Sequence, residues 1–329
     1  MTPLLEARNL ATWFPIKRGI LARTVGHVRA VDGVSLQIHT GETVGLVGES
    51  GCGKTTFGRT VLGLERPRSG ELRFRGQPLW QGPRRDVLPL RRRIQMIFQD
   101  PYSSLNPRMT VVEIVTEGLL EHGLISPRQR VEAALRWLGE VGMDASALHR
   151  YPHEFSGGQR QRISIARAVA LQPDLVICDE AVSALDVSVR AQVLNLLLAL
   201  RARHNLAYLF ISHDLSVVRH ITQRVGVMYL GVIVETGPTA VVLDRPLHPY
   251  TRALTSAVPV PFAERRTRLV LPGDVPSAAH PPPGCRFHTR CPFAVEACRH
   301  IVPQLEPAND GRLVACLRWA DLPPTETGG

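Results

Sequence analysis

The stretch GESGCGKTT, which starts at Gly48, contains the residue types that bind a chain of phosphates. It fits the pattern G-x-x-x-x-G-K-[ST] and stands between an apolar segment, TVGLV, and a helical one. Gly51 and Gly53 add backbone freedom, so the chain can wrap around phosphate oxygens with its N–H groups at a helix N-terminus. Lys54 would place a cation on the β and γ oxygens, and the Thr55 hydroxyl could ligate Mg²⁺. The stretch therefore predicts a nucleotide-binding phosphate loop.

A second stretch, LVICDE at residues 175–180, supplies the acidic residues that such a loop requires. Asp179 would lie at the carboxyl end of a buried strand and hold Mg²⁺ directly or through water. Glu180, next to it, could polarise an attacking water. The pattern is weak by itself, but downstream of a phosphate loop it indicates nucleotide hydrolysis.

The elements that must position these residues alternate between strands and helices. Apolar patterns predict strands over residues 3–10, 28–47, 175–179 and 206–212, and helices over residues 54–64, 127–142, 159–171 and 187–203. Strands that alternate with helices indicate a parallel α/β sheet. The basic, glycine-containing segment IKRGILARTVGH, at 16–27, predicts a hairpin loop. Beyond about residue 237 proline becomes frequent and helices become short, which predicts a separate C-terminal extension.

The composition is that of an ordinary globular protein with a basic surface. The chain has 329 residues and a net charge of +10, which suits nucleic acid, the anionic face of a membrane, or a solvated surface. Basic residues cluster at 66–68, 84–85, 91–93 and 264–268, but only 5% of residues are aromatic, which disfavours a stacking platform for single strands. No apolar run approaches the ~18 residues of a membrane span, and Glu6 interrupts the N-terminal segment where a signal peptide needs an apolar core. We expect a protein that is neither secreted nor embedded in a membrane by itself.

Four further motifs follow the phosphate loop. FQD at 98–100 and FSGGQRQR at 155–162 precede LVICDE, and SALD at 183–186 and ISHD at 211–214 follow it. This set, in this order, resembles the ATP-binding cassette of ABC transporters over about residues 4–237. The segments VGHVRAVDGVSL, DPYSSLNPR, SALDVSVRAQ and LHPYTRAL are similar to those of the dipeptide/oligopeptide importer ATPases of bacteria. The cysteine-containing tail matches that subfamily too, so the resemblance extends over nearly the whole chain.

The resemblance implies a role for individual side chains. Phe14 would stack on adenine, with Trp13 beside it as the rival. Gln99 would contact Mg²⁺ and the attacking water. Glu180 would be the general base, and His213 would contact the γ-phosphate and hold the base and the water in place.

Two sets of residues would contact nucleotide in such a cassette. The chain's own ATP would be cradled by the phosphate loop, namely Gly48, Ser50, Gly51, Gly53, Lys54, Thr55 and Thr56. The signature motif begins a helix whose N–H groups would cap the γ-phosphate of ATP bound to a partner subunit, through Ser156, Gly157, Gly158 and Gln159. Asp186 would lie at the seam between the two subunits.

The implied fold is an α/β P-loop NTPase cassette over residues 1–237, with a RecA-like core, an antiparallel β subdomain and a helical subdomain at about 100–170. A small, irregular, cysteine-containing extension would follow at 238–329. One cassette needs a second one facing it head to tail, so a partner ATPase, different in sequence, is expected. Two transmembrane permease subunits and an extracytoplasmic solute-binding protein would complete a peptide importer. The chain would work at the cytoplasmic face of the bacterial inner membrane.

Other functions remain as alternatives. Related importers carry nickel, haem or other small solutes, and an exporter ATPase is a further alternative. DNA-repair cassettes insert a long coiled coil between the phosphate loop and the signature, and the ~100 residues between Lys54 and Ser156 have no sustained heptads. Translation factors carry two cassettes in one chain, and this chain has one copy of each motif.

Four of the six cysteines gather near the C-terminus, separated by five, six and seventeen residues: Cys285, Cys291, Cys298 and Cys316. A cytoplasmic ATPase is an unfavourable place for a disulfide framework. Spacing alone leaves an iron–sulfur cluster, a zinc site and free thiols open. The resemblance favours a [4Fe–4S] cluster, because the tail is similar to one in which four such cysteines hold one. We expect the other two cysteines, Cys52 and Cys178, to be buried and structural.

Overall fold

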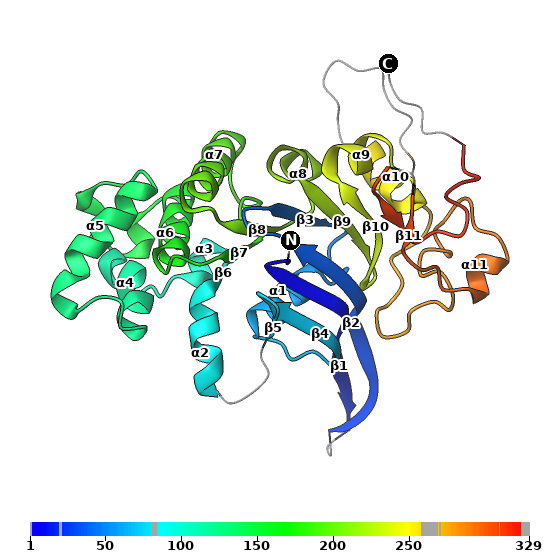
Figure 1. Ribbon diagram of the computed structural model, residues 1–329, viewed down its shortest axis with the longest axis horizontal. Helices are drawn as coiled ribbons and strands as arrows, with labels where there is room; N and C mark the ends of the chain where they lie inside the picture. The colour runs from blue at the N-terminus through cyan, green and yellow to red at the C-terminus, as the bar shows by residue number, and fades with distance from the viewer. Residues whose placement is uncertain are drawn as a thin grey trace. The chain divides into compact units, whose positions relative to one another are not determined.

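The computed structural model describes residues 2–19, 22–79, 84–257, 269, 271–308 and 310–323 (Figure 1). The chain divides into two compact units, and each has its own core. Unit 1 contains Met1–Gln37, Thr43–Pro78 and Ser212–Gly329, and unit 2 contains Ile38–Glu42 and Leu79–Ile211. In the part of the chain that the structure describes, no helix is both long and apolar enough to cross a bilayer.

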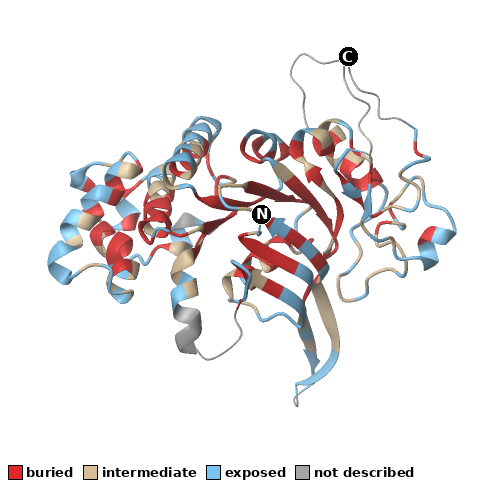
Figure 2. Cartoon of the chain, in the orientation of Figure 1, coloured by how far each residue is buried: buried red, intermediate tan, exposed pale blue. Residues whose placement is uncertain are grey.

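Unit 1 contains an antiparallel sheet of four strands in the order β2-β1-β4-β5. Its strands are β1 (Leu5–Arg18), β2 (Arg23–Ile38), β4 (Ser69–Phe74) and β5 (Gln77–Pro78). The hairpin loop predicted at 16–27 is therefore wrong for most of its length, because β1 continues to Arg18 and β2 begins at Arg23. The end of β1 and the start of β2 are largely exposed (Figure 2). Backbone pairing between β1 and β2, not burial of side chains, therefore supports these two strands there.

Unit 1 also contains the strands that carry the phosphate loop, in the order β11-β12-β10-β9-β3. They are β3 (Thr43–Val47), β9 (Arg224–Tyr229), β10 (Val232–Pro238), β11 (Glu306–Pro307) and β12 (Leu313–Val314). The β3 and β9 strands run parallel, whereas β9 and β10 form an antiparallel pair. The helices of this unit are α1 (Lys54–Leu62), α8 (Leu215–Ile221), α9 (Thr239–Asp244), α10 (Pro249–Ser256) and α11 (Ala297–His300).

Unit 2 has three parallel strands in the order β8-β7-β6, namely β6 (Ile94–Ile97), β7 (Leu175–Asp179) and β8 (Ala207–Ser212). All five residues of β7 are buried, which confirms the apolar strand predicted there. The helices are α2 (Arg84–Arg93), α3 (Pro101–Ser104), α4 (Val111–Glu121), α5 (Arg130–Glu140), α6 (Gly157–Ala170) and α7 (Val187–His204). Short 3₁₀ turns lie at Pro127–Gln129, Ala145–Ala147 and Pro152–Glu154. The helices predicted near 127–142, 159–171 and 187–203 are confirmed, with ends that differ by a few residues.

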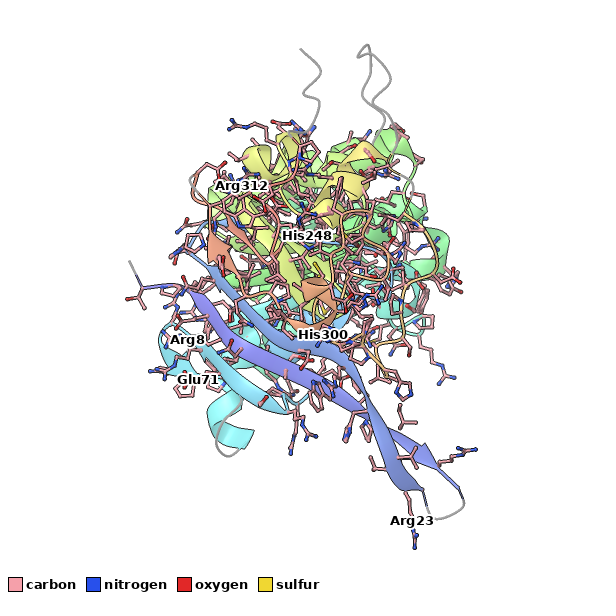
Figure 3. The ribbon with its side chains drawn as sticks, turned by 90° about the vertical axis from the view of Figure 1, so that its right-hand side faces the viewer. Arg8, Arg23, Glu71, His248, His300 and Arg312 are labelled. Carbon is pink, nitrogen blue, oxygen red and sulfur yellow. The ribbon has the colours of Figure 1, made fainter. Side chains whose placement is uncertain are left out.

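Within unit 1, the segment after α10 is held to β10 by a buried ion pair between Glu235 and Arg312. Figure 3 labels Arg312, and His248 at the start of α10. Glu235 is completely buried, and its carboxylate accepts the backbone N–H groups of Leu247 and His248 at 3.0 and 2.9 Å. Burial raises the pKa of Glu235. An arginine partner 3.3 Å away and two backbone donors offset part of the cost of removing this carboxylate from water. The pair ties two segments together that are 77 residues apart in the chain.

His248 is buried next to this pair, and its Nδ1 accepts the N–H of Tyr250 at 3.0 Å, which caps α10. Burial, with Arg252 nearby, lowers the pKa of His248 from 6.5 to about 3. Between these two values the unfolded chain binds a proton that the folded chain excludes. The free energy of unfolding should therefore fall as the pH falls below about 6.5, by up to ~1.4 kcal/mol per pH unit for this group.

Substitution of His248 tests this assignment. Asn keeps a side-chain acceptor for the N-cap and removes the titration, so His248→Asn should flatten the pH dependence of stability. Urea unfolding of both proteins at pH 7, 6 and 5 measures the effect. The stability difference between wild type and variant should change by more than ~1 kcal/mol over this range in favour of the variant. Parallel profiles would show that His248 is protonated in the folded state as readily as in the unfolded one.

Candidate nucleotide-binding site

The phosphate loop lies in unit 1 between β3 and α1, as its sequence predicts. Two of its glycines approach neighbouring backbone so closely that no side chain would fit. A Cβ on Gly48 would lie 2.1 Å from the carbonyl oxygen of Met228, and one on Gly53, at φ 108°, would lie 1.9 Å from that of Ala30. The loop is thus packed against β9 and β2 on one side, which fixes its shape for a ligand on the other side.

Lys54 is almost completely buried at the start of α1. Its Nζ donates hydrogen bonds to the carbonyl oxygens of Gly48 and Glu49 at 2.8 and 2.9 Å. Both of these acceptors are neutral, so they orient the cation without cancelling its charge. A buried cation within a loop of backbone N–H groups at a helix N-terminus fits a phosphate group of a nucleotide. Thr55 and Thr56 follow in the first turn of α1.

The aromatic residues proposed for adenine differ in their surroundings. The indole N–H of Trp13 donates to Asp32 at 3.0 Å, and the guanidinium groups of Arg29 and Arg68 lie 4.7 and 4.4 Å from the Trp13 ring. The ring of Trp13 is therefore engaged by the protein itself. Phe14, the next residue, is half-buried and remains the proposed adenine contact.

The residues predicted to act in hydrolysis that follow β6 and β7 lie in unit 2, at the carboxyl ends of these parallel strands. Asp179 ends β7 and is buried, and Glu180 follows it. The amide Nε2 of Gln99, which lies just beyond β6, donates to Glu180 Oε2 at 3.0 Å. Glu180 also adopts φ 47°, a left-handed conformation that costs a residue with a side chain about 1–2 kcal/mol. The structure thus brings together Gln99 and Glu180, residues 81 positions apart, and the roles assigned to them remain predictions.

The signature motif forms the N-terminus of α6 in unit 2. Ser156 Oγ accepts the N–H of Gln159 at 3.3 Å, and Gln159 Oε1 accepts the N–H of Ser156 at 3.0 Å. This reciprocal cap orients the first turn, in which Gly157 and Gly158 carry no side chains. A Cβ on Gly158 would lie 2.4 Å from Val189 Cγ1, so close packing against α7 requires glycine there.

Two other predicted site residues flank helices. Asp186 caps α7 by accepting the N–H of Val189 at 2.9 Å, and this hydrogen bond holds the pKa of Asp186 below its usual value. His213, in unit 1, is exposed in the turn between β8 and α8. The roles of Asp186 at a subunit seam and of His213 at the γ-phosphate remain predictions.

The predicted [4Fe–4S] cluster is wrong. Among the described residues, no group of three or more His, Cys, Asp or Glu side chains could hold a metal ion. The four C-terminal cysteines do line one cavity, but its volume is about 20 Å³, room for about one water and far too little for an eight-atom cluster. Burial also raises the pKa of Cys285 to about 11 and that of Cys291 to about 12, which favours the neutral thiols over thiolates. The zinc alternative is wrong for the same reason, because a zinc ion would also need a group of such side chains placed to hold it, and the described residues contain none.

The other two cysteines are buried, as predicted. Cys52 lies within the phosphate loop, with its sulfur 3.7 Å from Lys54 Nζ, and Cys178 is part of β7.

Sequence reasoning missed a different set of residues, which contact the phosphate loop from distant parts of the chain. Glu49 is contacted by Tyr250 and Arg290, which lie 201 and 241 residues further along the chain. Tyr250 belongs to the segment LHPYTRAL, but no local pattern connects it with the phosphate loop.

Comparison with known proteins finds relatives over almost the whole chain. The ABC transporter family matches residues 31–183, and the family described as "Oligopeptide/dipeptide transporter, C-terminal region" matches residues 234–298. The oligopeptide transport ATP-binding protein AppF of Bacillus subtilis is 51% identical over 317 residues, which cover 95% of this chain and 96% of AppF. The dipeptide transport ATP-binding protein DppF of Haemophilus influenzae is 49% identical over 316 residues, which cover 96% of each chain.

Solved structures with the same fold include cbiO1 of Clostridium perfringens, described as part of an ABC transporter complex. It has a TM-score of 0.62 and 24% identity over 74% of this chain and 91% of its own. A second is the dimeric, post-hydrolysis state of an ATP-binding cassette bound to ADP and Pi, with a TM-score of 0.63 and 26% identity over 71% of this chain and 98% of its own. The cassette fold predicted from the motifs is therefore confirmed. The chain belongs to the family of oligopeptide and dipeptide transport ATP-binding proteins of ABC transporters.

Proposed function

We propose that this chain is the ATP-hydrolysing subunit that powers a bacterial importer of dipeptides or oligopeptides. The observation that carries the proposal is the hydrogen bond between Gln99 and Glu180 at the carboxyl end of β7, beside the buried Asp179. A carboxylate held by a neutral amide next to a second carboxylate is suited to activate water beside a metal-bound phosphate. The names of the relatives supply the class of transported solute.

Each chemical task of ATP binding and hydrolysis then has a residue in this chain. Backbone N–H groups of the phosphate loop and Lys54 bind the phosphates of ATP. Thr55, Gln99 and Asp179 would hold Mg²⁺, which when bound offsets negative charge on the β- and γ-phosphates. Glu180 accepts a proton from the attacking water. The Gln99 amide offers a donor to Glu180 and an acceptor to the water, so it can align both.

His213 and Phe14 complete the proposed set. His213, exposed after β8, would contact the γ-phosphate and keep the water in place. Phe14 would stack on adenine, since Trp13 is already packed between arginine side chains. These two roles come from the family resemblance and from the surroundings of each residue.

The signature helix implies a partner. The N–H groups of Ser156, Gly157, Gly158 and Gln159 would cap ATP bound to a second ATPase subunit, which we propose is a different chain, and Asp186 would lie at the seam. Closure of the pair on ATP and its reopening after hydrolysis would drive two transmembrane permeases. A solute-binding protein outside the membrane would deliver the peptide.

The proposed division of the chain follows from these roles. Residues 1–237 form the cassette, with a helical subdomain at about 100–170, and residues 238–329 form the peptide-importer extension. We propose that the chain binds peripherally at the cytoplasmic face of the cell membrane. Of the basic clusters, the one at 264–268 lies outside the described residues, as do the side chains at 84–85. Arg93 pairs with Asp174 at 3.4 Å, so part of the cluster at 91–93 has a structural role.

Removal of the proposed base tests the hydrolytic assignment. Glu180→Gln keeps the hydrogen-bonding shape but cannot accept a proton, so ATP turnover should fall at least ~100-fold while ATP binding persists. Steady-state ATPase rates and equilibrium nucleotide binding separate the two effects. Glu132→Gln, at an exposed position of α5, is the matched control and should keep the wild-type rate. Undiminished turnover by Glu180→Gln would remove Glu180 as the base.

Reconstitution tests the transport assignment. The chain should be co-purified with its partner ATPase and permeases and placed in liposomes with the solute-binding protein. Peptide should stimulate ATP hydrolysis several-fold and accumulate on the side opposite the binding protein. Stimulation by a nickel chelate or haem but not by peptide would replace the substrate class, and movement of solute in the opposite direction would make the complex an exporter. Stimulation by DNA or ribosomes would contradict a transport function.

A further inference from the structure

The loop that carries the first two C-terminal cysteines also carries an arginine that reaches the phosphate loop. Arg290 donates from Nη1 and Nη2 to the two carboxylate oxygens of Glu49, at 2.8 and 3.2 Å. The Arg290 side chain is only 8% exposed and that of Glu49 is 30% exposed, so the arginine side of this paired contact is shielded from water. A two-pronged arginine–carboxylate contact fixes both the distance and the orientation of its partner. The C-terminal extension therefore holds one residue of the phosphate loop directly.

Glu49 is contacted at three points, and each contact belongs to a different part of unit 1. Its N–H donates to Tyr250 Oη at 2.8 Å, and its carboxylate binds Arg290. Its carbonyl oxygen accepts from Lys54 Nζ at 2.9 Å. In the proposed ATPase, the same Lys54 Nζ would bind phosphate from the place that this carbonyl helps to fix. The position of Glu49 thus sets the geometry from which the catalytic lysine starts.

The surroundings of Arg290 are aromatic and closely packed. The ring centroids of Tyr229 and Tyr250 lie 4.7 Å apart, and Phe287 of the cysteine-bearing loop packs on both, at 5.2 and 5.5 Å. The Arg290 guanidinium lies 6.0 Å from the Tyr229 ring. The hydrogen bonds with Glu49 raise the pKa of Arg290 further, so it stays charged throughout the working range. The contact is therefore built into a packed cluster.

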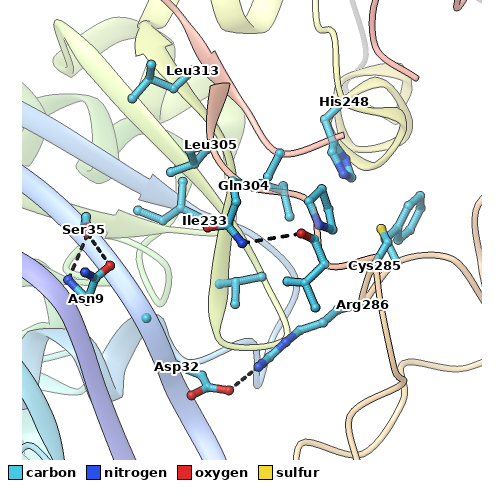
Figure 4. A pocket seen from close by; sticks show the side chains of 18 residues that line it. Asn9, Asp32, Ser35, Ile233, His248, Cys285, Arg286, Gln304, Leu305 and Leu313 are labelled. Atoms are coloured by element: carbon cyan, nitrogen blue, oxygen red, sulfur yellow. Dashed lines mark hydrogen bonds and ion pairs between the residues drawn. The ribbon is translucent and has the colours of Figure 1, made fainter. Parts of the chain in front are cut away.

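A second arginine of the same loop reaches the proposed adenine side (Figure 4). Arg286 pairs with Asp32 and also donates to the carbonyl oxygen of Leu230. Asp32 accepts the indole N–H of Trp13, which is adjacent to Phe14. The loop between Cys285 and Cys291 therefore contacts the phosphate loop through Arg290, and through Arg286 it contacts the carboxylate that binds Trp13.

We infer that Arg290 is a positioning residue of the ATPase, which fixes the phosphate loop through Glu49 and makes the C-terminal extension a working part of the nucleotide site. The inference rests on the proposed ATPase function and adds a residue outside its motifs. A residue that only stabilised the fold would not affect ATP binding in a folded variant. Loss of the contact between Arg290 and Glu49 should instead weaken phosphate binding in a protein that remains folded.

The test is a set of nucleotide-binding and kinetic measurements on the full chain with its partner ATPase. Arg290→Ala should raise the Kd and KM for ATP about tenfold, because a buried charge-assisted contact is lost, with a smaller change in kcat. Arg290→Lys keeps the charge without the fork and should recover part of the affinity. Glu49→Gln should raise the Kd as well. Arg299→Ala, in the same extension but 65% exposed, is the matched control and should leave all constants unchanged.

A double-mutant cycle decides whether Arg290 acts through Glu49. In the Glu49→Gln background, Arg290→Ala should add little to the Kd, since the pair is already broken. Fully additive effects, or a wild-type Kd and KM in Arg290→Ala and Glu49→Gln, would overturn the inference. If Arg290→Ala does not fold, Arg290→Lys and Glu49→Gln carry the same test. If the wild-type chain did not bind ATP, the proposed function and the inference would both fail, whereas loss of peptide transport with the Kd shifts intact would leave the inference standing.

Discussion

A buried cation beside an anion-binding loop is the constraint on which the nucleotide half of unit 1 depends. Lys54 must keep its charge in a place where water is largely excluded, and it must be able to exchange its partners for phosphate. The loop meets both needs by offering the carbonyl oxygens of Gly48 and Glu49, which are polar but neutral. The lack of side chains at Gly48 and Gly53 lets the loop pack directly on β9 and β2, so these carbonyls are held where the lysine can reach them.

The motifs predicted the strand, loop and helix around Lys54 well, because the residues of a phosphate loop are close together in the sequence. The loop, its strand and its helix lie within about twenty residues, and each residue type has one physical reason to be there. Buried strands such as β7 were equally predictable, since a short run of apolar residues before Asp179 leaves few alternatives. The separate roles of Gln99 and Glu180 were assigned through the family resemblance, but the hydrogen bond between these two side chains was not predicted, because residues that follow neighbouring parallel strands share no local pattern.

What could not be predicted depends on contacts across long stretches of chain. The extended ends of β1 and β2 lack a buried face, so the residues there read as a polar loop. The ion pairs of Glu235 with Arg312 and of Glu49 with Arg290 join residues that are 77 and 241 positions apart. The residues next to a charged side chain in the sequence do not indicate which distant residue it will pair with. The prediction of a cluster at the four C-terminal cysteines was wrong for a related reason, because cysteine spacing and family resemblance do not show how much space the folded chain leaves between the thiols. The cavity that these cysteines line has a volume of about 20 Å³.

These features describe an ATPase whose phosphate loop is supported from outside the cassette motifs. At the centre of this loop, Lys54 is held ready for phosphate. Lys54→Met keeps the length and apolar stem of the side chain and removes its charge. Equilibrium binding of ATP to the folded variant, compared with wild type, tests the claim most directly. We predict that the variant loses ATP binding by more than about a hundredfold, together with turnover. Binding of ATP with the wild-type Kd would contradict the account, because the buried cation would then have no part in holding the phosphates.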